Sequence, residues 1–203
     1  VGLGTLLGAF SASRHGQRAD ILLSTISLGL YSVPVFWLGL LLIIVFGLNL
    51  KWFPFTGYIS LGVKRGSLRA FVDILWHMVM PAATLTVGLY APIFMRIARA
   101  SVVEVMNEDY ITTARAAGLE ERIVFLRHAL RNAIVPVVQT VGVWMGQALT
   151  GVVLTETFFS WPGMGTLMYT AIIMRDYPLL MGIFLIAAIW IVLTFLVVDV
   201  ATA

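Results

Sequence analysis

The sequence predicts an all-α protein, a polytopic bundle of membrane-spanning helices. Of its 203 residues 60% are hydrophobic and only 11% are charged, whereas soluble domains carry about a quarter charged residues. The missing charge comes from long apolar stretches such as 22–50, which contains no charged residue. A run of about 20 apolar residues spans a bilayer, and in lipid the backbone must satisfy its hydrogen bonds as a helix.

Five hydrophobic segments are visible along the chain, at about 1–13, 21–48, 74–97, 134–155 and 178–198. The first starts within an apolar run, so we expect it to be a truncated helix and the chain to be part of a longer one. Pro34 lies inside the second segment, and Pro81 and Pro92 lie inside the third. Because proline removes a backbone hydrogen bond, these positions predict breaks where the helices pack against protein or line a cavity.

Basic residues predict which side of the membrane each loop faces. The segments 14–20 and 96–133 together carry eight arginines, and the segments on the other side carry five basic residues. The excess predicts a cytoplasmic loop at about 99–133 and outer loops at about 49–73 and 156–177 in a single transmembrane domain, 1–203. The net charge of +3, dispersed along the chain, indicates no nucleic-acid partner.

The predicted cytoplasmic loop contains a polar, helix-forming stretch. Asn107 is the expected N-cap of a first helix, Asp109 favours its first turn, and Gly118 is a natural helix stop. A second helix is expected from Glu120, with an apolar stripe of Ile123, Leu126, Leu130 and Ile134. Two short helices joined by a glycine elbow can fill a groove on a partner protein. The alternative is a solvated loop that packs on its own membrane helices.

The fourth hydrophobic segment carries small and polar residues at helical spacing. Gln139, Gly146 and Thr150 fall on nearly one line, with Gly142 and Gln147 beside it. Polar side chains in a membrane helix face protein or a water-filled cavity, so this line predicts part of a translocation path. The alternative is helix packing, which glycines four residues apart favour.

A second block follows this segment, Glu156-Thr157-Phe158-Phe159-Ser160-Trp161-Pro162-Gly163-Met164-Gly165, and then Arg175-Asp176-Tyr177-Pro178. Taken alone, it is typical of an aromatic belt at the membrane interface with a proline-glycine turn.

These blocks resemble those of ABC importer permeases, in particular the dipeptide, oligopeptide and nickel branch. The stretch DYITTARAAGL at 109–119, followed by HALRN at 128–132 and by Pro136, is similar to the cytoplasmic signature of that branch. Ala117 stands where the branch has lysine. The second block resembles its outer-side segment, with Glu156, Trp161, Pro162, Gly163 and Gly165 as the expected motif. Trp52-x-Pro54-x-x-Gly57 resembles the outer loop of the first, B-type, permease subunit.

The resemblance implies a six-helix permease subunit whose first polar helix is a coupling helix, seated in a cleft of an ATPase. The residues it places at this contact are Glu108, Tyr110, Thr112, Thr113, Ala114, Arg115, Gly118 and Leu119. ATP and Mg would then be bound by the ATPase subunits, and no cofactor is expected in this chain.

The activity implied is import. The chain would form half of a translocation pore for di- or oligopeptides, with a second homologous permease subunit, two ATPases and an extracytoplasmic binding protein. The implied location is the bacterial plasma (inner) membrane, crossed several times in contact with lipid. The same machinery can carry nickel, glutathione or a sugar. A secondary transporter fragment is the other alternative, although no carboxylate lies in the middle of a predicted span.

Several sequence patterns of enzymes are missing. The sequence has no G-x-x-x-x-G-K-[ST], so we expect no ATP binding by this chain itself. It has no H-E-x-x-H, no G-x-S-x-G and no cysteine, and its three histidines are scattered, so neither an intramembrane enzyme nor a metal site is predicted.

Overall fold

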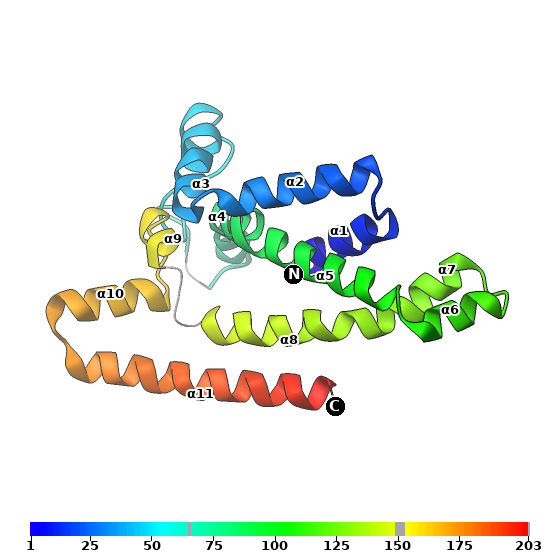
Figure 1. Ribbon diagram of the computed structural model, residues 1–203. Coiled ribbons are helices and arrows are strands. Elements are labelled where there is room, and N and C mark those ends of the chain that lie inside the picture. Colours follow the sequence, from blue (N-terminus) through cyan, green and yellow to red (C-terminus); the bar gives the residue numbers. More distant parts are fainter. Residues whose placement is uncertain (65, 149–152, 203) are drawn as a thin grey trace. The chain divides into compact units, whose positions relative to one another are not determined.

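The computed structural model describes residues 1–64, 66–148 and 153–202, without the side chains of 147 and 148, and every regular element in this part is helical (Figure 1). The α-helices are α1 Gly2–Ser13, α2 Arg18–Ser32, α3 Val35–Leu42, α4 Leu68–Leu85, α5 Ala91–Val105, α6 Asp109–Ala116, α7 Glu121–Ile123, α8 Leu130–Ala148, α9 Val153–Phe158, α10 Met164–Met174 and α11 Tyr177–Thr202. Three π-helical segments adjoin them, η1 Ile43–Asn49, η2 Thr86–Tyr90 and η3 Val124–Ala129. The all-α prediction is confirmed.

The chain divides into two compact units, each described by itself. Unit 1 comprises Val1–Ser32, Leu89–Val143 and Leu196–Ala203, and unit 2 comprises Val33–Gly88 and Trp144–Phe195. The single transmembrane domain expected over 1–203 stays a prediction.

In unit 1, α1 packs closely along α5. A Cβ atom added at Gly4 would lie 2.5 Å from the carbonyl oxygen of Ala91, and one added at Gly8 would collide with the carbonyl oxygen of Met95. Only glycine allows the two backbones to approach this far, as is typical of helix pairs in membranes. The helix that leads into the predicted coupling loop is thereby fixed against the first helix.

The same unit joins α5 to the beginning of α8. The Ser101 hydroxyl donates a 2.9 Å hydrogen bond to the Ala133 carbonyl oxygen. Ala12, Val102 and Ala133 form a buried apolar cluster beside it. Helix α5 therefore contacts α1 on one side and α8 on another before the chain turns into α6.

In unit 2, α3 packs against α4 and α9. A Cβ atom at Gly39 would lie 3.3 Å from the Thr84 Cγ2 atom and 3.5 Å from the Phe159 ring. The Gly57 N–H donates a 2.9 Å hydrogen bond to the Phe159 carbonyl oxygen, which ties the loop after η1 to the end of α9. Farther along, the Trp190 indole N–H donates a 2.8 Å hydrogen bond to the Met145 carbonyl oxygen.

Two helical runs of the described residues are long and apolar enough to cross a membrane, Leu68–Val105 and Tyr177–Thr202, and a third joins Arg18–Ser32 to Val35–Asn49 across a break. That break falls at Pro34, as predicted, because α2 ends at Ser32 and α3 begins at Val35. The other two predicted segments are helical where they are described, as α1 and α8. The first turn of α8 contains Arg131 and Asn132, which lower the mean hydropathy of this helix.

Two element boundaries differ from the expectation. Helix α4 begins at Leu68 rather than near residue 74, because the Ser67 hydroxyl caps it by accepting a 3.1 Å hydrogen bond from the Ala70 N–H. The range expected to be an outer loop, 156–177, contains the apolar helix α10.

Candidate functional site

The predicted coupling segment folds as a helical hairpin in which α6 lies beside α7 and η3 (Figure 1). Of the eight residues of α6, Ile111 is the one that is buried. Its side chain is 0% exposed and packs with Val124 and Ala129, which are also 0% exposed. One fully buried side chain therefore anchors α6, with Ala114 packed against the same cluster, and the other residues of the helix are exposed.

The buried side of the second helix differs from the predicted stripe. Ile123, Leu126 and Ile134 are 40%, 52% and 39% exposed, so these members of the stripe are not the residues that pack within the chain. The buried positions are instead Val124, Ala129, Ala133 and Val137. The reason is η3, since a π-helical segment brings residues five apart onto one side where an α-helix would align residues four apart.

Gly118 forms the turn between the two helices, as predicted. Helix α6 ends at Ala116, and Gly118 follows with φ of +81°, in the left-handed region that glycine adopts without strain. The start of the helix differs from the prediction. Glu108 is the N-cap residue, and the Asn107 side-chain amide donates instead to the Val103 carbonyl oxygen at 2.8 Å.

An ion pair closes the hairpin across this turn. Arg115 Nε and Nη2 donate hydrogen bonds of 3.0 and 2.8 Å to the two carboxylate oxygens of Glu121. Hydrogen bonding to Arg115 lowers the pKa of the Glu121 carboxyl. Arg115 was expected to contact an ATPase, and it is 41% exposed but engaged with Glu121 within the chain.

A hydrogen bond joins the two halves of the cytoplasmic signature. The Asn132 amide of α8 donates to the Tyr110 hydroxyl of α6 at 2.7 Å. With Ile111, this contact fixes the orientation of α6 about its axis. The sequence analysis missed the pairing of Tyr110 with Asn132, although both residues belong to the quoted motifs.

The predicted coupling residues are distributed around α6. Ala114 is partly buried, and the exposed ones are Glu108, Tyr110, Thr112, Thr113, Arg115, Gly118 and Leu119. The exposed residues of α6 thus include the short side chains of Thr112 and Thr113, and two acidic residues, Glu108 and Asp109, lie at the start of the helix. The short side chains at Thr112 and Thr113 allow close approach by another surface. The role of these residues in docking stays a prediction.

The structure describes some of the residues that were predicted to line a translocation path. Gln139 is exposed on α8, whereas Gly146 is buried. A Cβ atom at Gly146 would lie 3.4 Å from the Ile191 Cγ1 atom of α11, and one at Gly142 would lie 2.6 Å from Val198 Cγ2. These contacts support the packing interpretation for the two glycines. Thr150 lies outside the described residues, as does the side chain of Gln147.

The predicted outer-side motif forms one local structure around the Glu156 carboxylate. This carboxylate accepts a 2.8 Å hydrogen bond from the Thr166 N–H in the first turn of α10. It lies against the Gly163 backbone so closely that a Cβ atom there would collide with it. The Thr166 hydroxyl accepts a 3.1 Å bond from the Gly163 N–H. Gly163 has no side chain to cap α10, so Glu156 supplies the acceptor from α9.

The other members of this motif support the same turn. The Trp161 N–H donates a 2.8 Å hydrogen bond to the Glu156 carbonyl oxygen. Gly165 is buried, and a Cβ atom there would lie 3.0 Å from the Val153 Cα atom. Pro162 and Gly163 border an open surface pocket of about 560 Å³.

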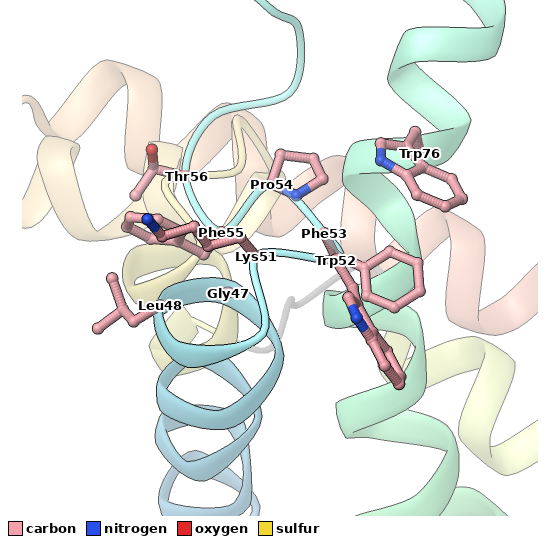
Figure 2. Close-up of a pocket in the computed structure, with 9 residues that line it drawn as sticks. All are labelled: Gly47, Leu48, Lys51, Trp52, Phe53, Pro54, Phe55, Thr56 and Trp76. Carbon is pink, nitrogen blue, oxygen red and sulfur yellow. The ribbon is translucent and has the colours of Figure 1, made fainter.

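A second pocket, of about 490 Å³, lies where the chain leaves η1 (Figure 2). Four of its nine lining residues are aromatic, namely Trp52, Phe53, Phe55 and Trp76, and Lys51 is the one charged residue of the lining. The Phe53 and Trp76 rings lie 4.7 Å apart between centroids, with their planes tilted by 41°. Lys51 adopts φ of +55°, a conformation that residues other than glycine seldom adopt. The Trp-x-Pro motif noted in the sequence therefore forms a concave aromatic surface.

Within residues 1–64, 66–148 and 153–202, no three His, Asp or Glu side chains gather closely enough to hold a metal ion.

Comparison with known proteins gives a consistent result. Residues 4–203 match the family of binding-protein-dependent transport system inner membrane components. The di/tripeptide transport system permease protein DppB of Pseudomonas aeruginosa is 39% identical over 212 residues, which cover 97% of this chain and 62% of that protein. The dipeptide transport system permease protein DppB of Escherichia coli K12 is 37% identical over 215 residues, covering 97% and 63%.

A relative from another bacterium fits the same pattern. The oligopeptide transport system permease protein AppB of Bacillus subtilis is 35% identical over 196 residues, covering 97% of this chain and 60% of that protein. The chain thus spans about three fifths of the length of the curated relatives it matches. The match runs through both signature blocks and confirms the resemblance seen in the sequence. This membrane protein belongs to the family of binding-protein-dependent transport system inner membrane components.

Proposed function

We propose that this chain is a transmembrane permease subunit of an ATP-binding-cassette importer and forms half of a translocation pore for di- or oligopeptides. The observation that carries the proposal is the construction of α6, which is anchored by buried Ile111 and otherwise accessible. A short helix held in this way transmits a displacement to the helices that carry it. The names of the relatives, which are di/tripeptide, dipeptide and oligopeptide permeases, support peptides as the cargo.

The proposed assembly contains a second homologous permease subunit, two ATPase subunits and an extracytoplasmic binding protein. ATP and Mg are bound by the ATPases, because this sequence has no phosphate-binding loop. The chain itself is not catalytic. It crosses the bacterial inner membrane several times, with the α6 hairpin in the cytoplasm and the Glu156 motif and the Lys51 pocket outside.

Within this proposal, α6 seats in a cleft of one ATPase and moves with it as ATP binds. Thr112 and Thr113 lie on its accessible side, and Leu119 is exposed just after the turn at Gly118. The short side chains allow the ATPase surface to approach closely. Arg115 acts mainly on Glu121, so its contribution is to keep the hairpin closed rather than to form the main contact with the ATPase.

Substitution of Gly118 tests the docking. The full-length protein is co-expressed with its neighbouring transporter genes, purified in mild detergent and assayed for associated ATPase subunits, ATP hydrolysis and uptake of a radiolabelled dipeptide. Gly118→Trp is expected to remain in the membrane and to lose the ATPases or uncouple them. Gly62→Trp is the matched control. Both glycines have φ near +80°, and a Cβ atom added at either would meet no atom within 4 Å, but Gly62 lies in the predicted outer loop.

Two results would contradict the proposal. If no ATPase co-purifies with the wild type, the importer assignment fails, and ion-gradient-driven transport becomes the next test. If Gly118→Trp takes up dipeptide as the control does, the docking site is wrong. A wild-type complex that hydrolyses ATP but moves only nickel, glutathione or a sugar would correct the cargo and leave the machinery unchanged.

A further inference from the structure

A buried carboxylate lies at the beginning of α2, outside every motif discussed so far. The Asp20 side chain is 2% exposed, and each of its carboxylate oxygens accepts two hydrogen bonds. Oδ1 accepts hydrogen bonds from the Ser11 hydroxyl at 2.5 Å and from Arg99 Nε at 2.6 Å. Oδ2 accepts from the Gly16 N–H at 3.0 Å and from Arg99 Nη2 at 2.8 Å. We call these four residues the Asp20 clasp.

The clasp joins three helices of unit 1. Ser11 belongs to α1, Asp20 to α2 and Arg99 to α5. Arg99 binds the carboxylate through two parallel hydrogen bonds, the strongest and most directional geometry available to an ion pair. His15 completes the surroundings, with its Nδ1 atom 3.1 Å from Arg99 Nη2 and 3.4 Å from Asp20 Oδ2.

Helix α2 depends on polar contacts of this kind. Its only buried residues are Asp20 and Ser27, and neither is apolar. The Ser27 hydroxyl donates a 3.3 Å bond to the Pro92 carbonyl oxygen, and the Arg96 guanidinium lies 5.6 Å from the centre of the Tyr31 ring. Both are weak contacts. The clasp is therefore the strongest polar contact between α2 and α5.

The position of the clasp on α5 relates it to α6. Arg99 lies six residues before the end of α5 at Val105, roughly 9 Å along the helix axis. Only three residues, Met106 to Glu108, separate α5 from α6. A displacement of α6 therefore reaches Arg99 within about two helical turns, and through Arg99 it reaches Asp20 and Ser11.

We propose that Asp20 is a positioning residue for transport, and that its clasp keeps α1, α2 and α5 together as one rigid body through the transport cycle. The proposal rests on the proposed importer function, because it is α6, driven by the ATPases, that would move this body. With the clasp intact, movement of α6 shifts α1 and α2 by the same amount. Without it, α5 moves and α2 lags behind, so ATP is hydrolysed with less transport.

The first test compares dipeptide uptake per ATP hydrolysed in the reconstituted importer. Asp20→Asn keeps the shape of the side chain and removes the charge, and we expect it to lower this ratio about tenfold, within the range of mutations that alter coupling between sites. Arg99→Lys keeps the charge but loses the two-pronged contact, so a smaller loss is expected. Glu104→Gln is the matched control, since Glu104 is an exposed acidic residue of α5.

A wild-type ratio in an assembled Asp20→Asn complex would overturn the proposal. If Asp20→Asn fails to accumulate in the membrane, Arg99→Lys and Ser11→Ala replace it, because both leave the opposite charges in place. A normal ratio in those two variants would count equally against the clasp.

The second test does not depend on transport. The chain has no cysteine, so spin labels can be attached at Leu22→Cys on α2 and Ala100→Cys on α5, two exposed positions near the clasp. The distance between the labels is expected to be the same with and without ATP in the wild-type complex and to broaden in Asp20→Asn. A wild-type distance that changes with ATP would show that the clasp opens, and the rigid-body proposal would be wrong.

The two tests separate failure of the clasp from failure of the importer function. A wild-type complex without ATP-driven uptake would refute the proposed function, while the label distances would still decide whether Asp20 holds α2 to α5.

Discussion

The anchoring of α6 by one side chain can be tested with two isoleucines of the same hairpin. Ile111→Ala removes three buried carbon atoms from a position that is 0% exposed. At about 0.8 kcal/mol for each carbon, the loss is roughly 2.4 kcal/mol, and the cavity left behind raises it to about 3 kcal/mol. Ile123→Ala removes the same atoms from a position that is 40% exposed. Its cost is about 1.4 kcal/mol, with no enclosed cavity.

The measurement is the rate of trypsin cleavage in the hairpin of the purified protein. Arg115, Arg122 and Arg127 remain in both variants, and cleavage requires the hairpin to open locally. An increase of about 100-fold is expected for Ile111→Ala and of about tenfold for Ile123→Ala. Equal increases, or a larger one for Ile123→Ala, would refute the assignment of Ile111 as the anchor and favour the stripe expected from the sequence.

Three further predictions concern other sites. Glu156→Ala should destabilise α10 by about 1 kcal/mol, because the Thr166 N–H loses the acceptor that caps the helix. The apparent Tm in detergent should therefore fall, and it should fall less for Glu156→Gln, which keeps an acceptor oxygen. The bond between Arg115 and Glu121 lowers the pKa of Glu121, so its contribution to the stability of the hairpin is present above the ordinary glutamic acid pKa of about 4.3 and is lost as the pH falls below that value. Trypsin cleavage cannot be used at such acidic pH, and fluorescence of a label beside Gly118 should report opening of the hairpin instead. Gln139→Leu should reduce dipeptide uptake more than complex assembly if this exposed side chain lines the path, and a loss of assembly alone would favour packing.

Local rules predicted the parts of this fold that depend on single residues. Pro34 breaks a helix because it lacks an N–H, and Gly118 ends one because it adopts positive φ. The proline rule alone is not sufficient, because α4 continues through Pro81, where a break was predicted, and α8 continues through Pro136. The apolar stripe could not be predicted in the same way. The assignment of residues to one side of the helix assumes 3.6 residues per turn, and the π-helical segment η3 departs from that value between Val124 and Ala129.

Contacts between residues far apart in the chain could not be predicted from the sequence either. Asp20 and Arg99 are separated by 79 positions, and nothing in the residues around either one indicates the other. Glu156 looks like an ordinary interfacial acid until Gly163, seven residues later, is seen to need a capping group from elsewhere. The motif was recognised from its residue pattern, whereas the role of Glu156 as the cap of α10 becomes visible only in the packing of α9 against α10.

The separation of Asp20 from Arg99 has a consequence for the synthesis of the protein. Ribosomes add roughly 5–20 residues per second, so Arg99 is made about 4–16 s after Asp20. During that interval the carboxylate lacks its counter-ion, and burying an unpaired charge is costly. The beginning of α2 must therefore stay hydrated while the following segments enter the bilayer. Nascent chains arrested before residue 99 should leave a probe at Ser11, which is 0% exposed in the finished fold, accessible to water, and longer chains should protect it.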